Sequence, residues 1–95
     1  MLPVVWSLDA RADLIEIIDF VNLWSPRAAL RLADVIEEST WLLETHPLAY
    51  RRSDRLEGCR EIVAHPNYVV VYKVFDTSVR IVAVFHAKAD YPRTP

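Results

Sequence analysis

The sequence of 95 residues is poor in cysteine and glycine and has no long hydrophobic run. Its single cysteine, Cys59, cannot form an internal disulfide, which fits a reducing compartment. No apolar run approaches the roughly 20 residues that a membrane-spanning helix needs, and the N-terminus lacks the basic flank of a signal peptide. One glycine leaves no glycine-rich phosphate loop, and His46, His65 and His86 are too scattered for a recognisable metal site. We therefore expect a cytoplasmic protein with no cofactor, no bound metal and no membrane partner.

Hydrophobic residues make up 53% of the chain and charged residues 25%, which is typical of a globular protein. The length predicts one domain over residues 1–95. The net charge of −2 is unevenly distributed, because residues 1–45 carry 3 basic and 8 acidic side chains whereas residues 46–95 carry 8 basic and 5 acidic ones. This predicts one acidic and one mildly basic face, and so a polar partner. It does not predict the basic surface of a protein that grips nucleic acid phosphates.

The C-terminal half predicts three consecutive antiparallel strands. We place them at Glu57–Ala64, Tyr68–Phe75 and Val79–His86, because turn-forming residues separate these β-branched and aromatic runs. The run from Tyr68 to Tyr72 is apolar without alternation, so this strand is expected in the middle of the sheet with both faces covered. Along the third strand, simple alternation predicts that Val79, Ile81, Ala83 and Phe85 face one side and Arg80, Val82, Val84 and His86 the other.

The N-terminal half predicts an edge strand and a helix. Leu2–Trp6 is a short apolar run with a proline near its start, which favours an edge strand. Ser7 or Asp9 is expected to cap the following helix by accepting hydrogen bonds from its free N–H groups. Apolar residues then recur at spacings of three and four as far as Trp24, so one stripe of this helix faces inward.

A second helix follows almost without a linker. Ser25-Pro26 combines a capping serine with a proline at the first helical position, and the apolar period continues to about Thr45. His46-Pro47 then ends the helix. Two helices joined so closely form an antiparallel hairpin. The predicted fold is therefore α+β, with the order β-α-α-β-β-β and the helical hairpin packed on a mostly antiparallel sheet.

Several short strings occur in this same order. They are Ala12-Asp13-Leu14-x-x-Ile17, Pro26-x-Ala28-Ala29, His46-Pro47, Gly58-x-Arg60-Glu61, Tyr68-x-Val70-x-Tyr72-x-Val74 and Val84-x-His86-Ala87. Together with the order of elements, they resemble the RelE/ParE superfamily of bacterial type II toxin–antitoxin toxins over nearly the whole chain. The resemblance implies a RelE/ParE-like toxin fold and a small toxin neutralised by a cognate antitoxin, whose C-terminal segment wraps the toxin as helix and extended strand. It also implies one of two activities, ribosome-dependent mRNA cleavage or inhibition of DNA gyrase.

The basic residues of the sheet help to choose between these activities. RNA cleavage needs a base, cations for the phosphorane charge and a proton donor. RelE-type nucleases place several Lys and Arg on the sheet and a Tyr or His near the C-terminus. On this sequence the basic positions fall on Arg60, Ile62, Val69 and near Ala89, which is next to Lys88, while His86 and Tyr91 remain as candidate acid or base.

Because most of these cations are missing, the resemblance favours the ParE branch, with DNA gyrase as the implied target. The alternative is an mRNA endonuclease of the RelE type that uses Arg60, His86 and Tyr91. A third hypothesis is a degenerate toxin-fold protein that only binds its antitoxin and represses its operon. Convergence of Arg60, Lys73, Arg80, Lys88 and His86 in one exposed concavity would contradict our preference.

We expect the antitoxin to contact Trp24, Trp41, Arg60 and Arg80. Trp24 lies next to the helix turn and Trp41 late in the second helix, and aromatic residues dominate interface energetics. The structural alternatives are core tryptophans, an Arg60 paired with a neighbouring glutamate, and a structural His86. Arg51-Arg52-x-x-Arg55 is interpreted as a solvated loop. An amphipathic helix beside the hairpin and a strand on an open sheet edge are the expected forms of the bound antitoxin.

Overall fold

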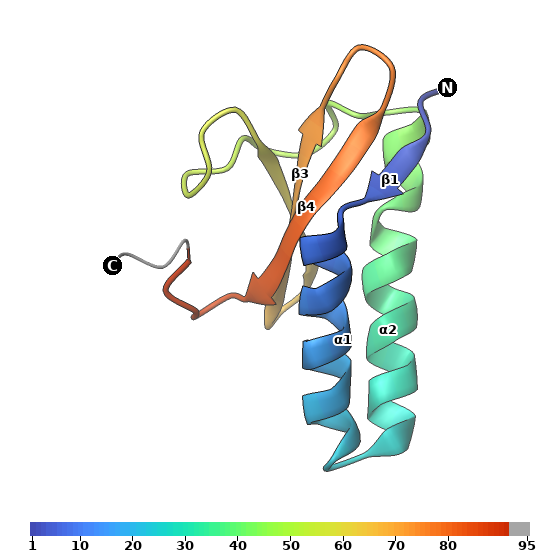
Figure 1. The fold of residues 1–95 in the computed structure, drawn as a ribbon, viewed down its shortest axis with the longest axis vertical. Helices are drawn as coiled ribbons and strands as arrows, with labels where there is room; N and C mark the ends of the chain where they lie inside the picture. The colour runs from blue at the N-terminus through green and yellow to red at the C-terminus, as the bar shows by residue number, and fades with distance from the viewer. Residues whose placement is uncertain (92–95) are drawn as a thin grey trace.

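A computed structural model of the protein describes residues 1–91 and has the predicted order of elements (Figure 1). The elements are β1 (Val4–Trp6), α1 (Leu8–Asn22), α2 (Pro26–Ser39), the short 3₁₀-helix η1 (Trp41–Glu44), β2 (Arg60–His65), β3 (Tyr68–Val74) and β4 (Val79–His86). The two helices form a hairpin that packs on one face of the sheet. The prediction of an α+β fold with a helical hairpin on a mostly antiparallel sheet is confirmed.

The sheet has the strand order β1-β4-β3-β2. β2, β3 and β4 pair antiparallel, and β1 pairs parallel to β4 through only three residues, Val4 to Trp6. β3 is flanked on both sides and Val69–Tyr72 is buried, as its unbroken apolar run predicts. β1 is the predicted edge strand.

The starts of both helices follow the capping pattern. The hydroxyl oxygen of Ser7 accepts a hydrogen bond from the Ala10 N–H at 3.0 Å, and that of Ser25 accepts one from the Ala28 N–H at 3.1 Å. Pro26 opens α2. Of the two residues proposed as the first cap, Ser7 therefore fills the role.

The second helix is shorter than predicted. It ends at Ser39, not at about Thr45, and continues as the tighter η1. The hydroxyl of Ser39 donates to the Ile36 carbonyl at 2.6 Å, and that of Thr40 donates to the Glu37 carbonyl at 2.7 Å. Two successive hydroxyls that bond back three residues compete with the α-helical pattern, and the i to i−3 bonds of a 3₁₀-helix follow.

A bulge in β4 overturns the predicted alternation of its side chains. Val71 pairs with Ala83 and Tyr72 with Ile81, so Val82 is an extra residue on β4. An extra residue shifts every later side chain to the opposite face. Val79, Ile81 and Val84 therefore face the helices, and Ala83 and Phe85 face away. The prediction that Val79, Ile81, Ala83 and Phe85 share one face was wrong.

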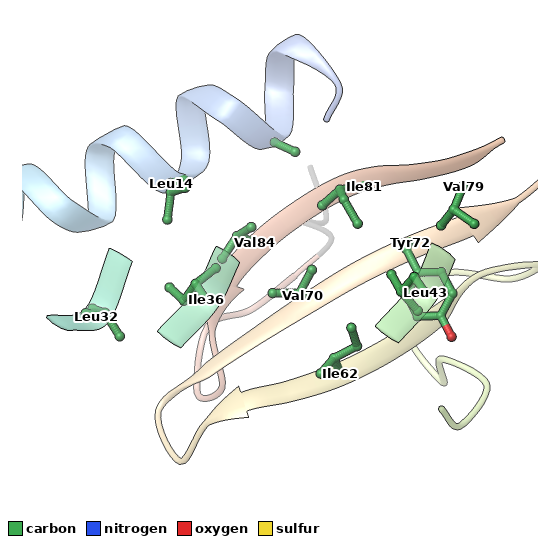
Figure 2. Packing of buried hydrophobic residues seen from close by; sticks show 11 residues of the cluster. Leu14, Leu32, Ile36, Leu43, Ile62, Val70, Tyr72, Val79, Ile81 and Val84 are labelled. Atoms are coloured by element: carbon green, nitrogen blue, oxygen red, sulfur yellow. The ribbon is translucent and has the colours of Figure 1, made fainter. Parts of the chain in front are cut away.

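Two apolar clusters cover the two faces of the sheet. The larger lies between the hairpin and the sheet, where Ile36 of α2 lies beside Val70 and Val84 (Figure 2). The smaller lies on the outer face, which we define as the face that carries Val69, Val71, Ala83 and Phe85. Its cover comes from two segments without helix or strand and includes Leu56, Cys59, Ala87 and Tyr91.

The loop before β2 explains why this strand begins three residues later than predicted. The Cys59 N–H donates to the Leu56 carbonyl at 3.1 Å, which closes a turn. Gly58 in this turn has φ +79°, a conformation that glycine adopts without strain. Glu57 and Gly58 therefore belong to the turn, and β2 starts at Arg60.

Candidate functional site

The predicted catalytic cations lie in separate places. Arg60 is paired in register with Tyr72 and faces the helix side, where its guanidinium donates to the Tyr50 carbonyl at 2.7 Å. Lys73 and Arg80 lie opposite each other on β3 and β4, and both approach the ring of Phe75, at 5.5 and 5.7 Å from its centroid. Arg60 therefore lies on the opposite face of the sheet from Lys73 and Arg80.

His86 and Lys88 lie at the other end of β4. His86 pairs in register with Tyr68, whereas Arg80 pairs with Lys73. Six residues along a strand correspond to roughly 20 Å at about 3.3 Å per residue. The five groups whose convergence would indicate a nuclease centre are therefore distributed over both faces and both ends of the sheet.

The hydrogen bond of the His86 ring fixes what this imidazole can do. Its Nδ1 accepts from the Lys88 backbone N–H at 3.1 Å, and the ring packs edge-on against Tyr68 at 5.3 Å. An acceptor Nδ1 requires that a neutral ring carries its proton on Nε2. In this geometry His86 can donate a hydrogen bond from Nε2, but it has no free lone pair to act as a general base.

The Tyr91 ring lies over the outer face, where it stacks on Phe85, and Arg55 contacts Phe85 and the segment before Tyr91. Its ring stacks on Phe85 at 4.4 Å with an interplanar angle of 15°, and the Arg55 guanidinium lies 4.9 Å from the Phe85 ring centroid. Arg55 also donates to the Ala87 carbonyl at 2.8 Å and to the Ala89 carbonyl at 3.1 Å. Burial raises the pKa of the Tyr91 phenol, and nearby carboxylates, Asp13 first, raise it further. The phenol is therefore a poor proton donor at neutral pH and is held in its neutral form.

His86 and Tyr91 share a groove of about 630 Å³ with residues of α1. We call it the edge groove. It is lined by Asp13, Glu16, Ile17, Val84, Phe85, His86, Ala89, Asp90 and Tyr91. Three of these residues are acidic, and no Lys or Arg is among the described residues that line the groove. Arg60, the third candidate nuclease residue, is not part of it.

Asp13 connects α1 to the sheet at this groove. Its Oδ2 accepts a hydrogen bond from the Val84 backbone N–H at 3.0 Å. Burial raises the pKa of Asp13, the Val84 N–H lowers it, and Asp9 and Glu16 raise it. The net direction is upward, so the folded state disfavours the ionised carboxylate.

We expect Asp13→Ala to lower the free energy of unfolding by about 1 kcal/mol, because the Val84 N–H loses its acceptor. Asp13→Asn keeps an oxygen acceptor without the charge and is expected to match or exceed the wild type at pH 7. Since the folded-state pKa lies above the ordinary 3.8, that advantage is complete above the folded-state pKa and shrinks as the pH falls toward 3.8. Urea unfolding of the three proteins at several pH values measures this. An alanine variant as stable as the wild type would contradict the role assigned to the bond.

The predicted antitoxin contacts do not form one surface. Trp24 is 79% exposed just before α2, and Trp41 is 66% exposed just after it. Neither is the core residue that was the structural alternative. Arg80 lies on the outer face beside Phe75, and Arg60 faces the helix side. The turn between the helices projects beyond the end of the sheet (Figure 1). We call the exposed apolar residues in this turn and in the adjoining ends of α1 and α2 the hairpin tip, namely Phe20, Leu23, Trp24 and Leu30.

Cys59 and the potential metal ligands offer little chemistry. Burial raises the pKa of the Cys59 thiol, and nearby Lys73 only partly offsets this. The thiol is therefore held in its unreactive form. Within residues 1–91, no group of three or more His, Cys, Asp or Glu side chains is arranged to hold a metal ion. In the same residues, no helix has the length and apolar character needed to cross a membrane.

Comparison with known families identifies the chain. A family model described as "ParE toxin of type II toxin-antitoxin system, parDE" matches residues 4–91. The chain belongs to this toxin family. It is thus a toxin of the RelE/ParE superfamily, as the order of its elements and short strings indicates.

Individual relatives come from both branches of the superfamily. The toxin is 38% identical over 87 residues to "Toxin RelE2" of Caulobacter vibrioides, a match that covers 92% of this chain and 97% of the relative. It superposes on a chain of the chromosomal ParDE toxin–antitoxin system of P. aeruginosa with a TM-score of 0.81 at 25% identity, covering 93% and 98% of the two chains. A chain of the E. coli DinJ-YafQ toxin–antitoxin complex gives 0.61 at 16% identity, covering 95% and 97%, which shows the shared fold.

The sequence analysis did not predict the buried carboxylate of Glu61. Glu61 is 6% exposed on β2, where its carboxylate pairs with the Arg51 guanidinium at 2.6 Å and accepts from the Ser53 hydroxyl at 3.1 Å. Arg51 and Arg55 thus fasten the 51–59 loop onto the sheet. Arg51 and Arg52 are exposed, as the interpretation of Arg51-Arg52-x-x-Arg55 as a solvated loop predicts, but Arg51 and Arg55 also make contacts within the protein that this interpretation did not include. The sequence signal for this ion pair is a glutamate within an apolar strand, ten residues after an arginine.

Proposed function

We propose that this toxin acts by docking on a protein target, DNA gyrase, and not by cutting RNA. The observation that carries the proposal is the dispersal of the cations. Arg60 is engaged with the Tyr50 carbonyl on the helix side, and Lys73 and Arg80 lie around Phe75 at the far end of the outer face. A phosphorane needs positive groups aimed at one point, and removing one such group typically costs about 3 kcal/mol of transition-state stabilisation.

The edge groove supports the same proposal through its charge. It holds His86 and Tyr91, but also Asp13, Glu16 and Asp90. These carboxylates repel an RNA phosphate, and the groove has no cation among its described lining residues to offset them. With its Nδ1 engaged by the Lys88 N–H, a neutral His86 can act as a proton donor but not as the base that the reaction also needs. Gyrase itself as the target comes from the resemblance to the ParE branch.

The alternative is ribosome-dependent mRNA cleavage with Arg60, His86 and Tyr91 as the acting residues. The relative named "Toxin RelE2", 38% identical over most of both chains, favours this alternative. It requires that the ribosome supplies the missing cations and that Lys88 releases the Nδ1 of His86. Both activities are therefore tested on the same protein.

The proposed partner is a cognate antitoxin, as in the ParDE and DinJ-YafQ systems to which the structural relatives belong. The hairpin tip exposes four large apolar side chains on a projecting turn. Such a surface fits the apolar face of an amphipathic helix, with aromatic residues as anchors. Trp41 lies at the opposite end of α2, about 20 Å away at 1.5 Å per residue, so an antitoxin helix must run along the length of α2 to reach both tryptophans.

We expect Trp24→Ala to weaken binding of the antitoxin encoded beside the toxin gene by at least about tenfold, because truncation of an aromatic anchor removes its buried contact area. Titration calorimetry with the purified pair measures this. The matched control is Val63→Ala, since Val63 is exposed on β2 and pairs with Val69 of the outer face, away from the hairpin. Equal affinities of the wild type, Trp24→Ala and Trp41→Ala for the antitoxin would show that the helical hairpin is not part of the interface.

Purified gyrase tests the target. Gyrase is incubated with relaxed plasmid and increasing amounts of toxin, with and without an excess of the antitoxin, and the extent of supercoiling is measured. We expect inhibition of supercoiling that the antitoxin reverses and that Arg60→Ala and His86→Ala leave intact. Full supercoiling at a large molar excess of correctly folded toxin would overturn gyrase as the target.

A further inference from the structure

Two cations lie side by side on the outer face, at the end of the sheet that carries the turn between β3 and β4. Lys73 of β3 pairs in register with Arg80 of β4, and Arg80 pairs with Val5 of β1. The residues before and after each cation belong to the cluster on the helix side, namely Tyr72, Val74, Val79 and Ile81. Because consecutive side chains of a strand point to opposite faces, Lys73 and Arg80 both point to the outer face, where both are exposed.

These two positive charges are not neutralised within residues 1–91. Neither Lys73 nor Arg80 makes an ion pair in this part of the chain. Asp76, in the adjoining turn, is the acidic residue nearest to both in the sequence, and it pairs with neither. Like charges directly opposite each other on antiparallel strands destabilise a sheet. An anionic group from outside the chain would remove this repulsion.

Phe75 restrains the two cations. The Lys73 ammonium lies 5.5 Å and the Arg80 guanidinium 5.7 Å from the centroid of the Phe75 ring. A cation over an aromatic ring is attracted to it, which limits the motion of two long side chains before a partner binds. Binding then costs less ordering of these side chains.

The same surface has an apolar part. Phe75 is 41% exposed, and Val5, next to Arg80 in register, is 45% exposed. Val5 lies on the outer face because its neighbours Val4 and Trp6 belong to the cluster on the helix side. We call the surface formed by Val5, Lys73, Phe75 and Arg80 the basic patch.

The basic patch fits an acidic protein segment better than a nucleic acid strand. The other arginines that contact the outer face are engaged, Arg51 with the Glu61 carboxylate and Arg55 with backbone carbonyls. The patch is therefore one positive point, whereas a phosphate backbone needs a track of cations. Both cations also lie over the Phe75 ring, so this ring is a poor platform for base stacking.

The basic patch is separate from the surfaces described above. The turn between β3 and β4 and the turn between the helices lie at opposite ends of the molecule (Figure 1). The patch is therefore remote from the hairpin tip, and none of its four residues is among the described residues that line the edge groove. Mutations in the patch can thus be made without changing either surface.

We propose that the basic patch is the surface through which the toxin docks on gyrase, by binding an acidic segment of that target in which an apolar residue lies next to a carboxylate. This proposal rests on the proposed function and gives it a contact surface and a chemistry. A carboxylate between Lys73 and Arg80 accepts charge-assisted hydrogen bonds from both and relieves their repulsion. The neighbouring apolar side chain covers Val5 and the edge of the Phe75 ring.

Binding of fluorescently labelled toxin to purified gyrase, followed by anisotropy, tests this assignment. We expect the patch variant Lys73→Gln with Arg80→Gln to bind gyrase at least about tenfold more weakly than the wild type, and to keep its affinity for the antitoxin. Glutamine removes the charges and their mutual repulsion, so the variant is expected to fold. Because salt screens exposed charges, the affinity of the wild type is expected to fall more steeply with added salt than that of the variant.

The matched control is Arg31→Gln with Arg52→Gln, which changes the net charge equally at exposed positions of α2 and of the 51–59 loop. We expect it to bind gyrase as the wild type does. Equal affinities of the patch variant and the wild type, or an equal loss in the control, would overturn the assignment and leave the proposed function intact. Absence of gyrase binding by the wild type would overturn both.

Two further titrations distinguish gyrase from other partners of the basic patch. The probes are a labelled single-stranded RNA of mixed sequence and the purified antitoxin, each titrated with the wild type and with the patch variant. We expect no RNA binding at toxin concentrations that bind gyrase. RNA binding that the patch variant loses would overturn the assignment in favour of nucleic acid. A loss of antitoxin affinity as large as the loss of gyrase affinity would overturn it in favour of the antitoxin.

Discussion

Ile36→Ala is expected to lower the free energy of unfolding by about 2–5 kcal/mol, the range for deleting a fully buried aliphatic side chain. Ile36 is 0% exposed and lies in the cluster that joins α2 to the sheet. Figure 2 shows it between Leu32 on its own helix and Val70 and Val84 on the strands. The loss has two parts. One is the transfer free energy of the deleted methyl and methylene groups, and the other is the cost of the cavity that remains because the helix and sheet layers cannot move together to fill it. For a domain of this size it corresponds to a fall in Tm of at least about 10 °C.

Leu30→Ala on the same helix is the matched control. Leu30 is 72% exposed at the hairpin tip, so its removal leaves no cavity. We expect it to change the free energy of unfolding by less than about 0.5 kcal/mol. Urea unfolding followed by circular dichroism measures both variants. Similar losses for Ile36→Ala and Leu30→Ala would mean that the hairpin does not pack on the sheet through this stripe.

Arg51→Ala is expected to cost about 2 kcal/mol, because it leaves the buried Glu61 carboxylate with only the Ser53 hydroxyl as a charge-stabilising side-chain partner. Glu61 is almost completely buried while Arg51 is largely exposed, so the desolvation falls mainly on the carboxylate. The 51–59 loop covers part of the outer face, and its release would also expose Leu56 and Cys59.

Glu61→Gln tests the physical reason for this loss. In the Glu61→Gln background no buried charge remains, so we expect Arg51→Ala to cost less than about 0.5 kcal/mol there. Arg52→Ala is the control, since within residues 1–91 its side chain makes no hydrogen bond or ion pair. An equal cost of Arg51→Ala in both backgrounds would show that the ion pair does not hold the loop.

Local signals in the sequence were sufficient for most of the fold. Ser7, Ser25 and Pro26 mark helix starts by chemistry that acts within one turn, so their effect does not depend on the rest of the protein. The unbroken apolar run from Tyr68 to Tyr72 gave the inner position of β3, because only a strand covered on both faces needs no polar side.

The errors in the fold have causes that local patterns do not contain. The bulge at Val82 depends on how β3 and β4 pair, and nothing in the sequence of β4 marks it. The early end of α2 does have a local cause, the consecutive hydroxyls of Ser39 and Thr40, but it competes with an apolar period that continues to Leu43. The prediction followed the apolar period and therefore placed the end of the helix too late.

The candidate site was predicted less well because it depends on surfaces. Sequence reasoning selected Trp24 as a candidate antitoxin contact, but not Phe20, Leu23 and Leu30, whose apolar character is equally typical of a core. It selected His86 and Tyr91 but not Asp13, Glu16 and Asp90, which share their groove and make it acidic. Tertiary packing determines which face of α1 contacts β4. The bulge in β4 also changes which of its side chains face α1.

The central claim is that the toxin has no means of its own to cut RNA, and programmed ribosomes test it most directly. Ribosomes with a defined codon in the A site are incubated with toxin, and the mRNA is examined for new ends by primer extension, with Arg60→Ala and His86→Ala as variants. We expect the mRNA to remain intact at toxin concentrations that inhibit gyrase. Cleavage at the A site by the wild type that either variant abolishes would contradict it.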